Sequence, residues 1–406
     1  MTKDRSLLQI PAGMRDFLPG EAQMKRALEN KWAQLYTSWS YEEVITPTVE
    51  YLDVLAIDTG EEMAGRLFQL FDRKGHIMVL RPEMTTPIAR LVASRLYKEP
   101  LPQRLFYGAN VFRYDEPQAG RQREIYQSGV ELIGAPGPLA DAEVIALAVE
   151  ALRESGLEDF QISIGQIDVF NGIMEELPLS PEEKVKISRL VAKKDFVSLE
   201  EFLDDHPLNL DQAELLLRLP TFHGSKEVLE EASILAVNEK ARQGLENLRQ
   251  VYEALSLYGV QDYIALDLGV LRGFDYYTGV VFEGYTEGLG FPICGGGRYD
   301  RLLAQMGFDS PATGFAIGLE RVLLALSRSN QPSPYPMPDV LLGGDNLPEI
   351  LGKAARLRAR GSIVEIDVLG LQEEALKAYA RERGIRNVVY FAASPQTEPD
   401  DSKEEA

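Results

Sequence analysis

Two long extended runs constrain the fold of this chain more than any other feature of its sequence. The first, Arg104–Asp115, reads RLFYGANVFRYD, and the second, Glu124–Gly134, reads EIYQSGVELIG. Both are rich in the aromatic and β-branched residues that strands prefer. Pro117 and Gly120 lie between the two runs and end the first one. Two such runs around a Pro/Gly loop predict a long hairpin, and therefore a fold built on an antiparallel sheet.

The second run also predicts a polar strand face. Because successive side chains of a strand point to opposite faces, Gln127, Gly129 and Glu131 share one face. Two polar groups beside a glycine suit an open surface that forms hydrogen bonds to a ligand. The same pattern is typical of a strand face that simply meets solvent, so the strand alone leaves both interpretations open.

A change in composition divides the chain. Glycine almost disappears over 173–258, where Leu, Glu, Ala and Lys dominate and prolines separate the helical patterns. Extended, glycine-rich patterns return afterwards. We therefore expect a helical insertion at 173–258, with one sheet built from 1–172 and 259–330. Apolar residues at helical spacing also predict helices over 21–39, 140–155 and 318–329.

The last quarter of the chain predicts a separate unit. Residues 331–338, QPSPYPMP, contain four prolines and are expected to form a semi-rigid linker. Alternating strand and helix patterns over 339–393 predict a small α/β domain of about three strands. Residues 394–406 are acidic, contain proline and are expected to be a disordered tail.

Composition narrows the possible functions. The 406 residues carry 42 Lys and Arg against 63 Asp and Glu, a net charge of −21 that opposes binding to nucleic acid. The single cysteine, Cys294, excludes an intrachain disulfide and a cysteine zinc site. Three widely spaced histidines predict no metal cluster. Because no apolar run approaches membrane-spanning or signal-peptide length, we expect a cytoplasmic chain without membrane contact.

Two further segments concentrate side chains that suit a free amino acid. Residues Arg81–Thr86, RPEMTT, combine a cation, a carboxylate and hydroxyls, while Leu271–Gly279, LRGFDYYTG, combines an arginine, an aspartate and two tyrosines. Carboxylates suit an α-ammonium group, and an arginine suits a carboxylate. Glu131 adds an acceptor for an imidazole N–H. The glycines of Cys294–Asp300, CGGGRYD, allow a close backbone approach to a ligand.

The order of these motifs resembles histidyl-tRNA synthetase. The matching stretches are RPE, VFRYDEPQAGRQREIYQSGVELIG, LRGFDYYTGVVFE, GGGRYD and GFAIGLERVL, within residues 7–330. The resemblance implies an α+β fold of the class II aminoacyl-tRNA synthetase type, with an antiparallel sheet flanked by helices. It also implies the helical insertion, a small C-terminal α/β domain similar to an anticodon-binding domain, and a homodimer through the segment ending near Pro47.

The resemblance also implies a histidine pocket and a vestigial ATP site. The matching histidine-binding positions are Glu83, Thr85, Gln127, Glu131, Arg272, Tyr276 and Tyr277. By this resemblance Glu83, Thr85 and Gln127 hold the α-amino group. Glu131 and the two tyrosines hold the ring, and Arg272 lies against the carboxylate. The positions that match an ATP grip are Arg113, Arg121 and Arg321.

Several positions depart from the enzyme's pattern. FRYERPQ reads FRYDEPQ here, so Asp115 is shorter by one methylene and Glu116 replaces an arginine. A glutamate at about 4–6 Å from a phosphate of ATP repels it. At an effective dielectric constant near 20 this repulsion weakens binding by on the order of 1–3 kcal/mol. Met84 replaces the glycine of RPEGT, and Arg301 replaces the glycine of RYDGL.

The C-terminal region departs as well. From Gln331 onwards it carries nine Lys and Arg against thirteen Asp and Glu. Reading an anticodon requires phosphate contacts and base stacking, to which a short acidic unit is poorly suited. Together, these departures resemble the synthetase paralogues that serve as regulatory subunits of ATP phosphoribosyltransferase.

That resemblance implies a subunit without catalytic chemistry or cofactor. It would pair with a short-form catalytic subunit, support the first step of histidine biosynthesis, allow feedback inhibition by histidine and bind no tRNA. Two alternatives stay open. The surviving arginines Arg113, Arg121, Arg272 and Arg321 favour an active histidyl-tRNA synthetase, and a scaffold whose pocket binds nothing is also conceivable.

Overall fold

The computed structural model describes residues 8–57, 65–115, 122–206, 208, 210–270, 277–328 and 337–392. The chain divides into two compact units, Met1–Pro332 and Ser333–Ala406. Each has its own buried apolar clusters, and each is described by itself below.

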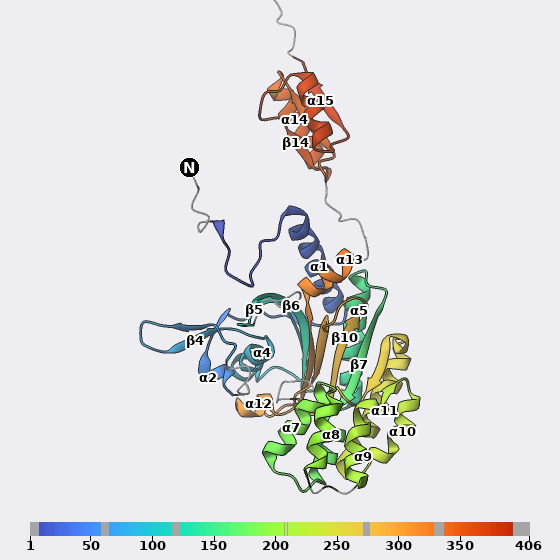
Figure 1. Cartoon of the computed structure of the whole chain (residues 1–406). Coiled ribbons are helices and arrows are strands. Elements are labelled where there is room, and N and C mark those ends of the chain that lie inside the picture. The colour runs from blue at the N-terminus through green and yellow to red at the C-terminus, as the bar shows by residue number, and fades with distance from the viewer. Residues whose placement is uncertain are drawn as a thin grey trace, which may run out of the picture. The chain divides into compact units, whose positions relative to one another are not determined.

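A nine-stranded mixed sheet forms the centre of the first unit (Figure 1). Among the described strands of this sheet, only two neighbouring pairs, β1 with β5 and β7 with β9, are parallel. This architecture confirms the predicted α+β class, with a largely antiparallel sheet flanked by helices. In sheet order the strands are β1 (Glu42–Glu43), β5 (Gln103–Phe112), β6 (Glu124–Ile133), β12 (Ala312–Gly318), β11 (Cys294–Arg298), β10 (Val280–Thr286), β7 (Phe160–Gln166), β9 (Ile264–Asp267) and β8 (His223–Gly224).

The predicted long hairpin is confirmed. Strands β5 and β6 pair in antiparallel register over ten residues each, from Gln103 opposite Ile133 to Phe112 opposite Glu124. On its other side β6 pairs with β12, which lies some 180 residues further along the chain, so that Glu131 faces Gly314. The sheet therefore continues after the helical stretch, as the returning extended patterns indicate.

Helices cover both faces of this sheet. Phe106 packs in the larger apolar cluster with α1 (Pro19–Ser38), α5 (Pro138–Glu154) and α13 (Leu319–Arg328). Its neighbours in β5, Leu105 and Tyr107, point to the opposite face and pack with α4 (Thr85–Leu91) and α12 (Leu302–Gln305). Successive side chains of β5 thus pack on opposite faces of the sheet, and helices cover both faces. Trp32 fixes α1 to α5, since its Nε1 donates a hydrogen bond to the Ala151 carbonyl at 3.0 Å.

A small second sheet has the order β2-β4-β3. A turn at Arg73–Gly75 joins β3 and β4, and Gly75 has a φ of 87°, which glycine adopts without strain. The segment Tyr41–Val49 contains the short strand β1 and the start of β2. The remaining elements here are β2 (Val49–Tyr51), α2 (Leu52–Leu55), β3 (Gln69–Phe71), β4 (Ile77–Leu80) and the π-helix η2 (Val92–Leu96).

Helices fill most of the glycine-poor stretch and gather at one end of the sheet (Figure 1). Their starts follow ordinary capping chemistry: Ser180 and Glu183 form a capping box, and the Asn238 side chain accepts the Ala241 N–H. The stretch connects the parallel strands β7 and β9, which need a crossover of this kind. The elements are α6 (Ile167–Glu175), α7 (Pro181–Ala192), α8 (Phe196–Asp204), α9 (Leu210–Arg218), η3 (Leu219–Thr221), α10 (Glu227–Glu231), η4 (Ala232–Leu235), α11 (Glu239–Leu257) and η5 (Gln261–Tyr263).

The second unit is a three-stranded parallel sheet between two helices. Its strand order is β14-β13-β15, and the predicted alternation of strand and helix is confirmed for every element. Ile350 and Ala354 of α14 pack on one face of β13, while Leu376 and Ala380 of α15 pack on the other. The bounds are β13 (Val340–Gly344), α14 (Leu347–Arg358), β14 (Val364–Ile366), α15 (Glu373–Glu382) and β15 (Val388–Phe391).

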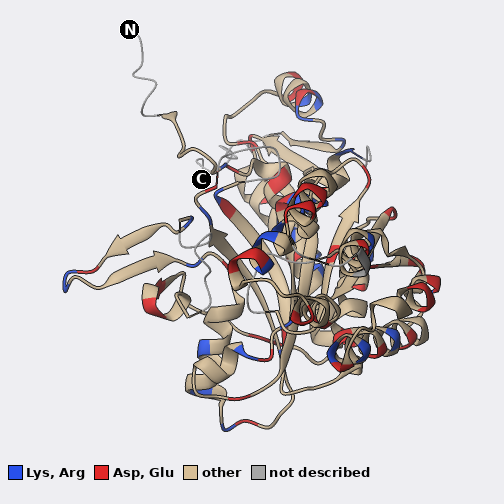
Figure 2. Cartoon of the chain, turned by 60° about the horizontal axis from the view of Figure 1, so that its bottom comes forward, with Lys and Arg blue, Asp and Glu red and all other residues tan. Residues whose placement is uncertain are grey.

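Charged residues of both signs are spread over the helices (Figure 2). On α11, for example, Arg249 lies between Glu246 and Glu253 and forms ion pairs with both. Within the described ranges, no helix combines the length and the apolar character that crossing a bilayer requires.

Candidate functional site

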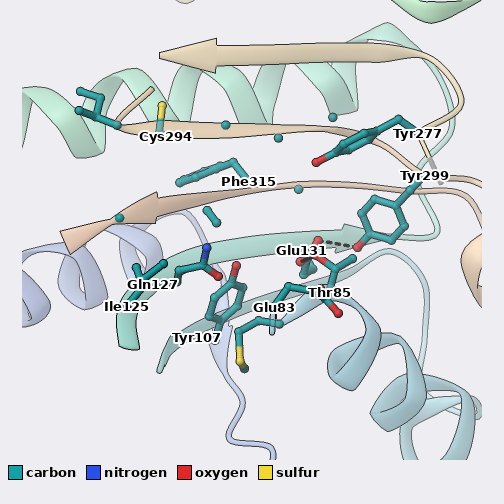
Figure 3. Close-up of a pocket in the computed structure, with 18 of the residues that line it drawn as sticks. Glu83, Thr85, Tyr107, Ile125, Gln127, Glu131, Tyr277, Cys294, Tyr299 and Phe315 are labelled. Carbon is teal, nitrogen blue, oxygen red and sulfur yellow. Dashed lines mark hydrogen bonds between the residues drawn. The ribbon is translucent and has the colours of Figure 1, made fainter. Parts of the chain in front are cut away.

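A cavity opens on the face of the sheet that α4 and α12 cover (Figure 3). Four neighbouring strands, β5, β6, β11 and β12, build its walls, and residues just before α4 and just before β10 complete it. Its lining includes Glu83, Met84, Thr85, Tyr107, Arg113, Ile125, Gln127, Glu131, Tyr277, Tyr299, Gly295–Gly297, Gly314, Phe315 and Arg321.

The polar face predicted for β6 belongs to this cavity. Gln127 and Glu131 both line it, as their shared strand face requires. The competing interpretation, a strand face that meets solvent, is wrong for Glu131, which is only 2% exposed. Residues far apart in the sequence meet here, since Thr85, Glu131 and Tyr299 come from three separate segments (Figure 3).

Glu131 is held by two hydroxyl groups. The Thr85 hydroxyl donates to one carboxylate oxygen at 2.9 Å, and the Tyr299 hydroxyl donates to the other. Burial raises the pKa of Glu131 to about 8, although both hydrogen bonds oppose that shift, and the nearby charge of Glu83 adds to it. This carboxyl therefore holds its proton more firmly than an exposed glutamate does.

Glu83 supplies a second buried carboxylate. It is 6% exposed, and its oxygens accept the Thr86 N–H at 3.1 and 3.2 Å, at the start of α4. Burial raises the pKa of Glu83, while these hydrogen bonds and the positive charge of Arg113 work against the shift. Two buried carboxylates beside one cavity favour a cationic ligand group, such as an α-ammonium, over an anionic one.

Glycines make room for this arrangement. A Cβ atom at Gly314 would overlap the Glu131 carboxylate, and one at Gly129 would overlap the Phe315 carbonyl and lie 2.6 Å from the Tyr107 hydroxyl. These glycines serve close packing between strands rather than a special backbone angle. The glycine run of β11 reaches the cavity as well.

Two of the three predicted ATP-site arginines line the same cavity. Arg113 Nε donates to the Pro82 carbonyl at 2.8 Å. Arg321 donates to the Pro292 carbonyl, and its guanidinium carbon lies 5.2 Å from the centre of the Phe291 ring. The third, Arg121, lies outside the described residues, as do Glu116, Arg272 and Tyr276.

The position of Arg81 corrects one part of the sequence-based interpretation. The motif RPEMTT predicts its cation beside the pocket. Arg81 is 5% exposed and does not line the cavity. Its guanidinium instead donates to the carbonyls of Thr46 at 2.7 Å, Pro47 at 3.1 Å and Asn110 at 2.9 Å. It therefore fixes the chain before β2 to β5, which is a structural task.

The positions that depart from the synthetase pattern have definite environments. Met84 is 1% exposed, packs with Ile88 and Tyr107, and also lines the cavity. Asp115 forms an ion pair with Arg66 at 3.5 Å. A side chain as large as methionine thus occupies space that a glycine leaves open.

Several side chains of the lining were not expected from the sequence, among them Tyr107, Tyr299 and Ile125. Tyr107 faces Gly129 across the β5–β6 pair, so strand alternation together with the hairpin register indicates its position. Tyr299 lies in the motif GGGRYD, whose glycines drew the attention instead. Ile125 shares the face of Gln127 two residues away. Across the described part of the chain, no group of three or more His, Cys, Asp or Glu side chains could hold a metal ion.

Comparison with known proteins identifies the family. Residues 13–322 match the family model described as histidyl-tRNA synthetase. A protein named ATP phosphoribosyltransferase regulatory subunit, from Desulforamulus reducens, is 47% identical over 392 residues, which cover 96% of this chain and 97% of that protein. This chain belongs to the family of ATP phosphoribosyltransferase regulatory subunits. A regulatory subunit from Moorella thermoacetica is also 47% identical, over 93% of this chain and 97% of its own length.

Solved structures agree with this family. A crystal structure described as an ATP phosphoribosyltransferase regulatory subunit/histidyl-tRNA synthetase from Bacillus halodurans superposes with a TM-score of 0.86 at 33% identity. The match covers 96% of this chain and 99% of that one. Histidyl-tRNA synthetase from Nostoc sp. PCC 7120 gives a TM-score of 0.81 at 25% identity, over 95% and 91% of the two chains. The predicted resemblance to synthetase-like regulatory subunits is thus confirmed.

Proposed function

We propose that this chain is the non-catalytic regulatory subunit of an ATP phosphoribosyltransferase and that the cavity of Glu83 and Glu131 binds free histidine. In this proposal it pairs with a short-form catalytic subunit in the cytoplasm. The pair carries out the first step of histidine biosynthesis, and histidine inhibits that step. The observation that carries the proposal is a cavity with two buried carboxylates in a chain whose relatives are named regulatory subunits over nearly their whole length.

The chemistry of the cavity supports histidine as the ligand. An α-ammonium group placed between Glu83, Thr85 and Gln127 would donate charge-assisted hydrogen bonds to the buried Glu83 carboxylate, which water cannot solvate. An imidazole N–H at Glu131 would find an acceptor already oriented by two hydroxyl groups. In the proposal Tyr276 and Tyr277 also contact the ring, and Arg272 contacts the ligand's carboxylate.

The departures from the synthetase pattern support the loss of aminoacylation. Met84 fills space beside Glu83, and Asp115 is paired with Arg66. Glu116 places a negative charge in the loop that matches the ATP grip, which opposes a triphosphate. The C-terminal unit is acidic, so it lacks the charge that phosphate contacts require, and the proposal includes no tRNA.

Feedback requires histidine to bind two states of the assembly with different affinities. A coupling free energy of about 1–3 kcal/mol, or roughly 5- to 150-fold in affinity, is sufficient. We propose that the two states differ in how a homodimer of this chain holds the catalytic subunits.

Reconstitution tests this proposal. The short-form catalytic subunit is assayed for ATP-dependent phosphoribosyl transfer alone, with this chain, and with this chain plus histidine. We expect activity to require the chain and histidine to suppress it. Calorimetry on the isolated chain should show histidine binding, which Glu83→Ala should abolish because the α-ammonium loses its buried partner.

An active histidyl-tRNA synthetase is the second candidate, because Arg113 and Arg321 still line the cavity. It predicts histidine-dependent exchange of pyrophosphate into ATP and charging of a tRNA transcript. We expect both to stay at background, and robust charging by the purified chain would replace the first proposal with the second.

A further inference from the structure

The small parallel sheet of the second unit has two edge strands, and the two edges differ in how they are protected. Strand β14 forms one edge and carries Glu365 at its centre. The Val364 carbonyl, which points away from β13, accepts a hydrogen bond from the Arg358 guanidinium at 2.9 Å. A charged residue and a covered carbonyl both discourage a further strand from pairing with this edge.

Strand β15 forms the other edge and carries neither a charged residue nor a proline. Its sequence, VVYF, is apolar and aromatic, and all four side chains are half-buried. The Leu341 N–H donates to the Asn387 carbonyl at 2.9 Å, which fixes the pairing with β13. Because backbone groups alternate in direction along a strand, the N–H and C=O of Val388 and Tyr390 point away from β13. We call Val388–Phe391 the β15 edge.

Two copies of the β15 edge are complementary to each other. When Val389 lies opposite Val389 of a second copy in an antiparallel pair, Val388 lies opposite Tyr390 of that copy. The outward N–H and C=O groups of these two residues then form hydrogen bonds with one another. The pairs Val388–Tyr390 and Val389–Val389 join β-branched and aromatic side chains, which stabilise sheets. One two-fold axis satisfies both copies at once.

A pair of opposite charges supports the same register. Arg386 of one copy comes opposite Ala392 of the other, on the face of the sheet where Tyr390 packs with α15. The pairing of β13 with β15, continued by one residue, places Ala392 beside Asp345, whose Oδ2 lies 3.2 Å from the Tyr390 hydroxyl. Because neighbouring strands are about 4.8 Å apart, Arg386 of the second copy lies about 10 Å from Asp345 between Cα atoms. Only a methyl group separates the two side chains.

Net charge favours a second copy over the chain's own C-terminal end as the occupant. Residues 337–392 carry eight Lys and Arg and eight Asp and Glu, so two folded units do not repel each other through net charge. Residues 393–406 carry five Asp and Glu against one Lys, and Pro395 and Pro399 lack the N–H that a paired strand donates.

We propose that the C-terminal units of two copies of this chain associate through the β15 edge. The two strands pair antiparallel about Val389 and join two three-stranded sheets into one continuous sheet. Arg386 of each copy pairs with Asp345 of the other. The inference goes beyond the proposed function, because it gives the C-terminal unit the task of holding two copies together and requires neither histidine nor a catalytic subunit.

Disulfide trapping on the full chain tests this pairing. Val389→Cys places two thiols in a non-hydrogen-bonded pair with Cα atoms about 4.5 Å apart, a separation that a disulfide spans. Ile366→Cys is the matched control, because Ile366 is also half-buried and packs in the same apolar cluster but lies on the other edge strand. Under mild oxidation Val389→Cys should form a covalent dimer about five- to tenfold faster than Ile366→Cys. The unaltered chain, whose single Cys294 is buried, gives the background.

Charge reversal tests the register and leaves the β15 edge itself unchanged. Arg386 and Asp345 are both exposed. In the Val389→Cys chain, Arg386→Glu alone or Asp345→Lys alone should slow disulfide formation about three- to tenfold, because like charges then meet at both ends of the symmetric pair. The two reversals together should restore the original rate.

Three outcomes would overturn the proposal. The first is equal trapping of Val389→Cys and Ile366→Cys, and the second is a double charge reversal that does not recover the rate. The third is loss of trapping when the short-form catalytic subunit is added, since that partner would then occupy the β15 edge. A chain that is trapped as expected but neither binds histidine nor activates the catalytic subunit would contradict the proposed function alone.

Discussion

Glu131 makes the stability of the folded chain sensitive to pH. Burial raises its pKa from the usual 4.5 to about 8, so across this interval the folded chain keeps a proton that the unfolded chain has released. The free energy of unfolding therefore falls as the pH rises from about 5 to about 8, by at most ~1.4 kcal/mol per pH unit from this group.

The variant Glu131→Gln should remove this contribution, because an amide does not titrate. Urea unfolding of both proteins at several pH values between about 5 and 8 measures the effect. We expect the variant to gain stability relative to the unaltered chain as the pH rises. Parallel stability profiles for the two proteins would show that the carboxyl already ionises at low pH in the folded chain.

Gly314 is the position where one methyl group should damage the site most directly. A Cβ there overlaps the Glu131 carboxylate, so Gly314→Ala must move Glu131 away from Thr85 and Tyr299 or shift β12. We expect a loss of about 1–3 kcal/mol in stability and weaker histidine binding. Gly290→Ala, whose added Cβ has no atom within 4 Å, serves as the control for unfolding and calorimetry.

At the same scale, strand alternation predicted which side chains of β6 share the cavity, and the structure places Gln127 and Glu131 there together. It could not predict that Arg81 turns away, because that depends on the carbonyls of Thr46 and Pro47 being within reach of its guanidinium. Tyr299 was equally inaccessible, since its hydrogen bond to Glu131 spans 168 residues of sequence.

Among the secondary-structure elements, β11 and α5 are joined by a buried ion pair. Arg298 Nε lies 3.0 Å from both carboxylate oxygens of Asp141, in the first turn of α5, and the Arg298 guanidinium also donates to the Ala135 and Gly137 carbonyls. The side chain of Asp141 is 1% exposed and that of Arg298 is 8% exposed, so breaking the pair leaves a buried guanidinium with only the more exposed Asp300, at 3.1 Å, as its charged partner.

Asp141→Asn should therefore lower the free energy of unfolding by about 3–5 kcal/mol. The control is Glu253→Gln, which removes the exposed partner of Arg249 on α11 and should change stability by less than about 0.5 kcal/mol. Urea unfolding measures both variants. A similar small effect for the two would show that water or a rearranged side chain solvates Arg298.

The elements that the sequence predicted well are those with local signals. Turn residues and alternation define the β5–β6 hairpin, and each strand and helix of the C-terminal unit follows from its own periodicity. The parallel pairing of β7 with β9 has no local signal, because the two strands are about a hundred residues apart and only the crossover packing brings them together.

For the whole molecule, the site belongs to one of the two compact units. Every residue that lines the cavity lies in Met1–Pro332. A chain that ends at Pro332 should therefore fold and bind histidine with a dissociation constant within about twofold of the full chain, since it keeps both apolar clusters around the sheet.

Circular dichroism and calorimetry of this shortened chain make the measurement. A folded product without histidine binding would mean that the C-terminal unit supports the cavity in a way its own packing does not indicate.

The overall class could be predicted from the sequence because long motifs in a fixed order resemble a known family. The boundaries of the helical insertion stay a prediction.

The contact between α6 and α11 has a practical consequence. Asn238, which caps α11, donates to the Gly172 carbonyl at 2.9 Å and to the Glu176 carboxylate at 3.0 Å. The chain therefore leaves this contact after Glu176 and returns to it at Asn238. Helices α6 and α11 themselves lie on either side of this excursion, in the crossover between β7 and β9. An exchange of residues 177–237 between relatives would therefore need only two short joints, but the replacement would also have to reproduce the pairing of β8 with β9.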